Sequence, residues 1–570
     1  MAAEKNTGGN KLTAVEHIKS RSNYLRGTLL ESLADSATGA LAEDDTQLSK
    51  FHGFYQQDDR DVREQRRRQL LEPDHQFMIR ARVPGGVCTC EQWLALDRIA
   101  REYANGTIRI TTRQAVQLHG VLKHRLKPTI RGINDSLLDT FAACGDVNRN
   151  VMCTSLPETS SLHLQVFQAA AALSEHLTPN TTAYHEIWLD KEKIAGGDHE
   201  PIYGPSYLPR KFKISFAIPP RNDVDVYAHD LSFIAITGNG TEKGELIGFN
   251  VTVGGGMGVS HGDPGTYPRL ADVIGFCSVE QVVGLAEAVV MLQRDHGDRS
   301  ERKHARLKYT IDDHGLEWFH QELEQRLGYR LEAAKDFAFT HTGDRYGWQK
   351  TADGYWHLGL FIQNGRVADR GPTRLLSGLR AIAEVHDGEF RFTANQNLII
   401  CNVQDPDRER IDQLVRAHGL DGFNKSSPLR LNSMACVGFP TCGLSLAESE
   451  RYLPDLVTKI ESLLADHDLS EQAITIRMTG CPNGCARPYL AEIGLIGKGP
   501  GLYNLHLGAA YNGDRLNRMF RESVQESEIL KILDELFGGY VSQRNDEEHF
   551  GDYLLRSGVL DAAVEKEKMT

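Results

Sequence analysis

Four cysteines in the C-terminal part of the chain have the residue type and spacing of metal ligands. They form two compact pairs, Cys436 with Cys442 and Cys481 with Cys485, and the segment between the pairs is long enough for a helix and a strand. Structural zinc sites favour pairs with about two to four intervening residues, so the first pair is wide for zinc. Iron–sulfur clusters accept four thiolates at varied spacings. The pattern therefore favours an iron–sulfur cluster and leaves zinc as the alternative.

A second group of candidate residues consists of cations within apolar, strand-like segments. Its members are Arg80, Arg82, Arg109, Arg113, Arg149, Lys211 and Lys213, and the polar residues Gln117 and His119 follow Arg113. One such residue is usually a surface charge. Several together in segments that should line a core would repel one another strongly unless an anion accompanied them. We therefore expect a polyanionic ligand, which the glycine-rich loop 254–258 could approach closely.

The elements that must position these residues occur twice. The stretch NGTIRITTRQ from Asn105 resembles DGEFRFTANQ from Asp387, and each follows a strand-like segment and a segment with helical periodicity. The shared turn, Arg and Thr at fixed offsets favour duplication over chance. A duplicated chain predicts an α+β, pseudo-two-fold body with a cleft between its halves, which is a common place for a large cofactor.

Length and composition narrow the class of protein. The 570 residues predict about three or four domains. The net charge of −13 argues against a nucleic-acid-binding protein. No apolar run approaches the roughly 18 residues of a membrane-spanning helix, and the polar N-terminus has no secretory signal. We therefore expect a cytoplasmic protein without membrane contact, in which the other cysteines are free thiols. These are Cys88, Cys90, Cys144, Cys153, Cys277 and Cys401.

Several motifs resemble those of the sulfite and nitrite reductases that contain sirohaem and a [4Fe–4S] cluster. The similarity runs from about Ser22 to Tyr553 and is greatest to the haemoprotein beta subunits of the bacterial NADPH-dependent assimilatory enzymes. The motifs are FHGFYQQDDR from Phe51, NRNV from Asn148, YLPRKFK from Tyr207, NSMAC from Asn432 and TGCPNGC from Thr479. Matches spread over nearly the whole chain make this resemblance specific.

The resemblance implies a role for each candidate residue. The cluster ligands would be Cys436, Cys442, Cys481 and Cys485, and Cys485 would also be the axial thiolate of the sirohaem iron. The substrate-binding and catalytic cations would be Arg80, Arg149, Lys211 and Lys213. The residues that hold the macrocycle would be Arg113, Gln117, His119, Arg306 and Asn483. Sirohaem carries several carboxylates, which accounts for the surplus of cations.

The resemblance also implies a domain organisation. Residues 1–77 would form an N-terminal arm that docks a partner. Residues 78–142 and 348–423 would form a duplicated ferredoxin-like domain. Residues 143–347 would form the first sirohaem-binding domain, and residues 424–570 the second, which carries the cluster cysteines.

The implied activity is the six-electron reduction of sulfite to sulfide for cysteine biosynthesis. The implied partner is a FAD/FMN flavoprotein that takes electrons from NADPH, in a hetero-oligomer. Reduction of nitrite to ammonia is the alternative, but the pair Lys211 and Lys213 favours the more highly charged sulfite. A non-catalytic scaffold stabilised by a metal would explain the cysteines and leave the cations and the repeat unexplained.

Overall fold

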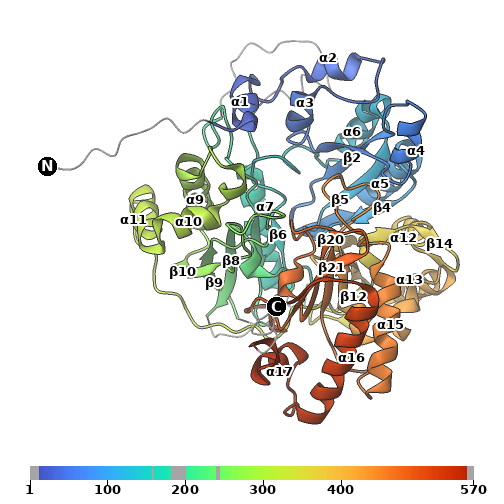
Figure 1. Cartoon of the computed structure of the whole chain (residues 1–570). Helices are drawn as coiled ribbons and strands as arrows, with labels where there is room; N and C mark the ends of the chain where they lie inside the picture. The colour runs from blue at the N-terminus through green and yellow to red at the C-terminus, as the bar shows by residue number, and fades with distance from the viewer. Residues whose placement is uncertain (1–11, 157–159, 182–199, 239–243, 562–570) are drawn as a thin grey trace.

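The computed structural model describes residues 12–156, 160–181, 200–238 and 244–561. Within these residues, four five-stranded sheets and the helices around them form the body of the protein (Figure 1). Helices α1 (Ala14–Arg21), α2 (Leu29–Ala34) and α3 (Glu43–Leu48) lie together at the top of the view in Figure 1. The α+β, duplicated body expected from the sequence is confirmed by the pairing of the strands.

Two of the sheets are antiparallel and exchange a strand with each other. The first has the order β1 (Phe54–Asp58), β2 (His75–Ala81), β5 (Val116–Val121), β4 (Ile108–Ile110), β13 (Arg366–Val367). The second has the order β11 (Gly347–Lys350), β12 (Trp356–Leu360), β17 (Leu398–Val403), β16 (Glu389–Phe392), β3 (Val87–Thr89). An outermost strand of each sheet therefore comes from the other half of the chain, which ties the two halves together.

The strands β4 and β16 carry the sequence repeat at equivalent positions. Arg109 pairs with Gln117 on β5, and Arg391 pairs with Ile399 on β17. The segment 1–77, expected from the sequence as an arm, contributes β1 to the first of these sheets through its pairing with β2.

Helices pack on these two sheets in matching places. They are α5 (Cys90–Tyr103) and α6 (Leu126–Asp135) in the first half, and α12 (Leu375–Ala383) and α13 (Asp405–Ala417) in the second. Helix α5 shows why such a segment is helical. Thr89 accepts a hydrogen bond from the backbone N–H of Gln92, whose side chain in turn accepts one from the backbone N–H of Thr89, and together they form a capping box. Trp93 and Leu96, one turn apart, are among the residues that the helix buries.

The other two sheets share a mixed topology. One has the order β10 (Asp272–Cys277), β9 (Leu246–Val253), β8 (Leu231–Thr237), β7 (Ile214–Ala217), β6 (Met152–Cys153). The other has the order β18 (Ser433–Ala435), β19 (Ile476–Thr479), β20 (Ile493–Gly499), β21 (Leu502–Leu507), β22 (Arg518–Val524). In both, the first three strands in chain order pair in parallel and the remaining pairs are antiparallel. The same pattern in both sheets extends the duplication to these units.

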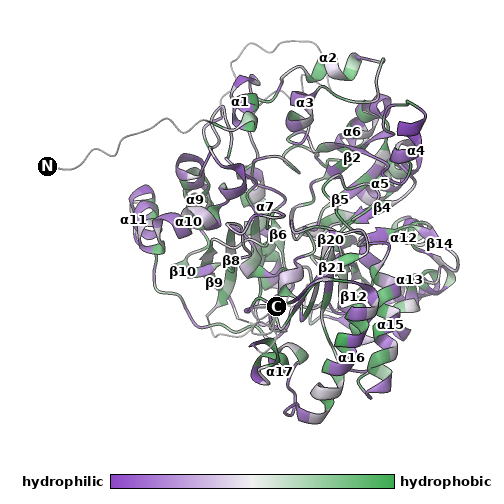
Figure 2. Ribbon diagram, viewed as in Figure 1, coloured by the Kyte–Doolittle hydropathy of each residue, from purple (hydrophilic) through white to green (hydrophobic). Residues whose placement is uncertain are grey.

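The remaining helices cover the outside of these sheets or connect them. They are α4 (Arg63–Arg68), α7 (Ser160–His176), α9 (Val282–His296), α10 (Leu307–His314), α11 (Leu316–Leu327), α14 (Pro428–Leu431), α15 (Leu453–Asp466), α16 (Glu526–Gln543) and α17 (Phe550–Arg556). Figure 2 shows the contrast between α4, which is hydrophilic and buries no residue, and the hydrophobic strands of the interior. The described residues contain no helix that is both long and apolar enough to cross a membrane.

The strand exchange depends on two glycines at which one half touches the backbone of the other. Gly86, just before β3, has φ +76°, and a Cβ there would lie 2.4 Å from the carbonyl oxygen of Phe392. Gly365, just before β13, has φ +73°, and a Cβ there would lie 2.2 Å from the carbonyl oxygen of Ile110. Only glycine fits such a left-handed, crowded position.

We predict that Gly86→Ala lowers the free energy of unfolding by about 2 kcal/mol more than Gly106→Ala, because both positions have a left-handed backbone but only Gly86 also meets a backbone atom. Gly106 has nearly the same φ, +77°, and a Cβ added there would have nothing within 4 Å. Urea unfolding of the two variants measures the difference. Equal urea midpoints for the two variants would show that the contact between Gly86 and the backbone of the other half tolerates a side chain.

Candidate cofactor and substrate site

The four cysteines lie where two neighbouring parallel strands end. Cys436 follows β18, and Cys481 and Cys485 follow β19, which pairs with β18 in parallel. The carboxyl ends of parallel strands meet at one edge of the sheet, so these loops are neighbours. The backbone N–H of Gly480 donates to Cys436 Sγ at 3.2 Å. The side-chain amide of Asn483 donates to Cys481 Sγ at 3.4 Å.

The four thiols form one electrostatic group. Burial raises the pKa of Cys442 and of Cys481 to about 12, and the neighbouring thiols, Cys436 and Cys485 among them, contribute to the rise in each case. Burial and the adjacent Cys485 also raise the pKa of Cys436. Such thiols bind as thiolates only when a metal supplies compensating positive charge.

The described residues hold no three His, Cys, Asp or Glu side chains gathered closely enough for a single metal ion. The choice of a cluster over zinc therefore rests on the wide first cysteine pair and on the family relationship reported below.

Cys485 is the most exposed of the four cysteines and lies toward the cations. Its thiol interacts electrostatically with Arg80 and Lys211 and favours their charged forms. Its carbonyl oxygen accepts a hydrogen bond from Thr112 Oγ1 at 2.9 Å, which joins the cysteine loop to the loop after β4. The arrangement brings a candidate metal ligand and candidate anion-binding residues into one site.

Two of the four predicted substrate cations meet at a single loop. Arg80, on β2, donates to Cys144 Sγ at 2.8 Å and to the carbonyl oxygen of Ala143 at 3.4 Å. Arg149 donates to the same Ala143 carbonyl at 3.3 Å and to Gly145 at 2.9 Å. Carbonyl and thiol partners orient these guanidinium groups without neutralising them, so both charges remain available to an anion.

The other two cations, Lys211 and Lys213, are side by side on the strand-like segment before β7. Burial, and then repulsion by Arg210, lower the pKa of Lys211 to about 7. Burial, and then Lys211 and Arg306, lower the pKa of Lys213 well below its usual value. Asp230, a carboxylate that faces this group, is already engaged. Arg306 contacts it at 2.7 and 3.0 Å, and the backbone N–H of Lys213 donates to it at 3.0 Å.

Arg113 lies in the same excess of buried positive charge. Its guanidinium donates to the carbonyl oxygens of Asn150 and Ile214, at 2.6 and 3.1 Å. Burial, and then repulsion by Arg149, lower its pKa to about 9. A set of buried cations that lower one another's pKa is stabilised by a bound polyanion.

Buried polar atoms with no partner in the described residues support the same conclusion. They include Arg113 Nε, both ring nitrogens of His119, Asn148 Oδ1 and Thr479 Oγ1. Arg113 and His119 are residues that the resemblance assigns to the macrocycle, and a ligand rich in carboxylates and ring nitrogens could supply their partners. The residues present therefore fit a polyanionic macrocycle.

The glycine-rich loop 254–258 lies against the second cysteine pair. The backbone N–H of Val259 donates to the carbonyl oxygen of Pro482 at 2.9 Å. A Cβ on Gly484 would lie 2.8 Å from the carbonyl oxygen of Met257. Lys308 Nζ fixes the loop by donating to the carbonyl oxygens of Gly256 and Gly258 at 3.2 and 3.0 Å. The structure thus places this loop beside the candidate cluster cysteines, where its backbone could face a bound macrocycle.

Some of the predicted site residues already have hydrogen-bond or ion-pair partners within the protein. Gln117 accepts from Arg109 at 3.3 Å, and Arg109 is held by Glu450 and by the carbonyl oxygen of Ala435 beside Cys436. Arg306, predicted to hold the macrocycle, is paired with Asp230. Sequence reasoning did not single out Cys144, Asp230, Lys308 or Glu450, because none belongs to a spacing that indicates a ligand.

The duplicate of this site, in the other half, has different chemistry. The strand registers place Asp223 at the position equivalent to Cys485 and Thr154 at that of Cys436, and Thr154 Oγ1 donates to Asp223 at 2.9 Å. A hydrogen-bonded polar pair therefore occupies the place of two candidate cluster ligands.

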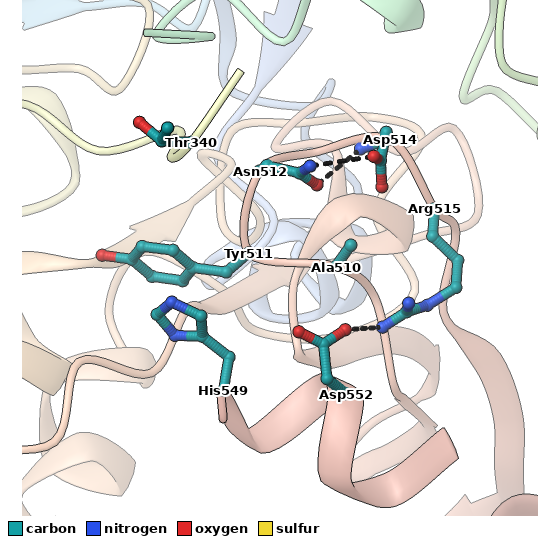
Figure 3. Close-up of a pocket in the computed structure, with 8 residues that line it drawn as sticks. All are labelled: Thr340, Ala510, Tyr511, Asn512, Asp514, Arg515, His549 and Asp552. Atoms are coloured by element: carbon teal, nitrogen blue, oxygen red, sulfur yellow. Dashed lines mark hydrogen bonds and ion pairs between the residues drawn. The ribbon is translucent and has the colours of Figure 1, made fainter. Parts of the chain in front are cut away.

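A pocket of about 250 Å³ lies along residues 508–512, which the strand registers make equivalent to the glycine-rich loop 254–258 (Figure 3). Its lining is Thr340, Ala510, Tyr511, Asn512, Asp514, Arg515, His549 and Asp552. Arg515 is engaged by Asp552 at 2.5 Å, and Asp514 adds a second acid. This acidic lining does not suit a polyanion. The pocket therefore differs in charge from the cation-rich site at the equivalent loop of the other half.

We predict that Cys442→Ser strongly lowers the iron and acid-labile sulfide of the purified protein, because one of four thiolates is lost. Cys277→Ser is the matched control, since Cys277 is a buried thiol at the end of β10 and far from the quartet in sequence. Iron and sulfide analysis of both variants tests the assignment. Unchanged contents in Cys442→Ser would remove Cys442 from the ligand set.

Comparison with known proteins identifies the family. The model of the nitrite/sulfite reductase ferredoxin-like half domain matches residues 68–136 and 349–418. The model of the nitrite and sulphite reductase 4Fe-4S domain matches residues 168–331. The latter match covers the unit built on β7 to β10, and the four cysteines lie in the duplicate unit.

Full-length relatives give the same result. A protein of Myxococcus xanthus named sulfite reductase [NADPH] hemoprotein beta-component is 58% identical over 547 residues, which cover 96% of this chain and 97% of the relative. One of the same name from Geobacillus kaustophilus is 55% identical over 96% of each chain. The solved structure of the Mycobacterium tuberculosis NirA protein matches with a TM-score of 0.77 at 27% identity and covers 96% of this chain and 97% of its own. The chain belongs to the nitrite and sulphite reductase family.

Proposed function

We propose that this chain is the haemoprotein subunit of a sulfite reductase and reduces sulfite to sulfide by six electrons. The observation that carries the proposal is the group of Arg80, Arg149, Lys211 and Lys213 beside the candidate cluster ligand Cys485. Within the described residues, none of these four side chains forms an ion pair with a carboxylate, and the nearby Asp230 is paired with Arg306. Relatives at 58% and 55% identity bear the name sulfite reductase hemoprotein, which makes the chain an oxidoreductase.

Sirohaem and a [4Fe–4S] cluster, when bound, supply an iron that holds the substrate and a store of single electrons. On the protein side, Cys436, Cys442, Cys481 and Cys485 would hold the cluster, and Cys485 would also serve the sirohaem. Arg113, Gln117, His119, Arg306 and Asn483 hold the macrocycle.

The four substrate cations have two tasks. They neutralise the charge of sulfite, and they donate hydrogen bonds that polarise its S–O bonds. Arginine keeps its proton at any ordinary pH, whereas a buried lysine can release one. The pKa of Lys211 is lowered to about 7, and that of Lys213 is lowered strongly by burial and the neighbouring cations. The lysines are therefore the proton donors to departing oxygens.

Two neighbouring lysines favour a doubly charged substrate. Nitrite carries one charge and would leave part of the cationic group uncompensated, so sulfite is the better match for Lys211 and Lys213. Reduction of nitrite to ammonia is the second candidate, because the same cations would also bind nitrite, although less tightly than sulfite.

We further propose that electrons come from a FAD/FMN flavoprotein subunit that oxidises NADPH, in a cytoplasmic hetero-oligomer. The names of the relatives, which contain NADPH and beta-component, support a second subunit. Residues 1–77 would dock it. Arg60, within this segment, donates to the carbonyl oxygens of Cys442 and Ser445 at 3.2 and 2.6 Å, so the segment reaches the cluster loop.

We predict that the purified protein shows the visible absorption bands of sirohaem and that these shift when sulfite is added after reduction. Turnover with sulfite is expected to exceed turnover with nitrite in kcat/KM. Spectra and initial rates with methyl viologen as the reductant provide both measurements. Fully metallated protein without macrocycle bands would contradict the proposal, and a preference for nitrite would favour the second candidate.

We predict that Lys213→Ala keeps both cofactors and loses most sulfite turnover, because the variant lacks a charge and a proton donor. Lys213→Arg restores the charge alone, so its KM for sulfite should stay close to that of the unsubstituted protein while kcat remains low. Absorption spectra establish the cofactor content before the rates are measured. Unchanged turnover in Lys213→Ala with full cofactor content would exclude the role of Lys213.

A further inference from the structure

A fully buried lysine from the N-terminal segment lies behind the substrate cations. Lys19, on α1, has an exposed fraction of 0%. Its Nζ lies 2.5 Å from Glu16 Oε1 and 3.4 Å from Asp146 Oδ2, and it donates to the carbonyl oxygen of Leu208 at 2.7 Å. A buried ammonium persists only where such partners surround it.

Three consecutive carbonyl oxygens of the segment 207–209 are each held by a different cation. Arg299 donates to Tyr207 at 2.7 Å, Lys19 to Leu208 at 2.7 Å and Arg302 to Pro209 at 3.3 Å. Tyr207 also has a left-handed backbone, with φ 54°. Contacts on three successive residues fix the path of this segment, which leads directly to Lys211.

Two buried carboxylates connect the three cations. Glu16 contacts Arg299 at 2.5 Å as well as Lys19. Asp146 accepts from Arg302 at 2.8 and 3.0 Å as well as from Lys19. Lys19 is therefore the central member of the network, in contact with both acids, and the two outer pairs can persist without it.

The same network supports the loop that carries Arg149. The backbone N–H of Leu208 donates to the carbonyl oxygen of Asp146 at 3.0 Å, and that of Phe212 donates to Val147 at 3.0 Å. The backbone N–H of Arg149 donates to Phe212 at 2.9 Å. Because the two loops are bonded together in this way, the position of Leu208 affects both Lys211 and Arg149.

We propose that Lys19 is a positioning residue for the substrate cations, acting through the Leu208 carbonyl on Lys211 and through Asp146 on Arg149. The proposal rests on the proposed function, since it takes sulfite as the anion that these cations bind. Without Lys19 the segment 207–213 samples more conformations, and the cations are no longer held in the arrangement that binds an anion.

Lys19→Met tests the proposal, because it keeps most of the side-chain volume and leaves the Glu16–Arg299 and Asp146–Arg302 pairs in place. In the reduced holoenzyme, we expect the Kd for sulfite from spectral titration to rise about tenfold, equivalent to about 1.4 kcal/mol. The Kd for carbon monoxide, a neutral ligand of the haem iron, should stay within about twofold. Hydrogen–deuterium exchange of amides 208–213 should become faster.

Arg430→Met is the matched control. It breaks a partly buried ion pair, 2.6 Å from Glu461, that joins α14 to α15 in the other unit. In Arg430→Met, we expect the Kd for sulfite, the Kd for carbon monoxide and the exchange rates of amides 208–213 to stay unchanged. An unchanged sulfite Kd in Lys19→Met, or an equal loss of sulfite and carbon monoxide binding, would overturn the proposal.

A weaker variant covers the case in which Lys19→Met does not accumulate as holoenzyme. Arg299→Gln removes the cation on the Tyr207 carbonyl together with its ion pair to Glu16, and it leaves Lys19 on the Leu208 carbonyl. We therefore expect a smaller rise in the sulfite Kd with unchanged carbon monoxide binding, and no rise would overturn the proposal. Sulfite binding by the unsubstituted protein is measured alongside. Its absence would refute the proposed function, whereas the exchange of amides 208–213 still tests the positioning role.

Discussion

Uncompensated positive charge in the interior is the constraint on which the rest of the site depends. Burial and neighbouring cations lower the pKa of Arg113, Lys211 and Lys213, because burial removes the water that would screen their charges. A carboxylate beside them, Asp230, is taken up by Arg306. A polyanionic cofactor and an anionic substrate would relieve this repulsion, so the charges that repel one another also select the ligands of the site.

Duplication supplies the frame, and divergence of a few side chains decides what each half binds. Both mixed sheets bring two loops together at the ends of parallel strands. In one half the loops carry Cys436 and Cys485, and in the other they carry Thr154 and Asp223, which bond to each other. The pocket on this side (Figure 3) is lined by Asp514 and Asp552, whereas the site beside the cysteines is rich in cations. Equivalent backbones thus carry a candidate polyanion site in one half and a hydrogen-bonded polar pair in the other.

The N-terminal segment has a structural role beyond that of an appendage. Its β1 extends the first antiparallel sheet, Arg60 reaches the carbonyl oxygens of the cluster loop, and Lys19 holds the segment before Lys211. The region proposed to dock the electron donor is therefore bonded both to the cluster loop and to the loops of the substrate cations. Hydrogen bonds of this kind connect segments that lie far apart in the sequence.

The sequence by itself determined the fold class and the duplication and supplied the candidate residues of the site, because repeats, cysteine spacing and cations in strand-like segments are local patterns. It could not determine the strand exchange, since β3 and β13 are short and their partners lie far along the chain. Nor could it reveal Lys19, Asp230 or Glu450, whose importance comes from burial beside other charges. Those positions are decided by tertiary packing, which alone sets which charges lose their water and which find a partner.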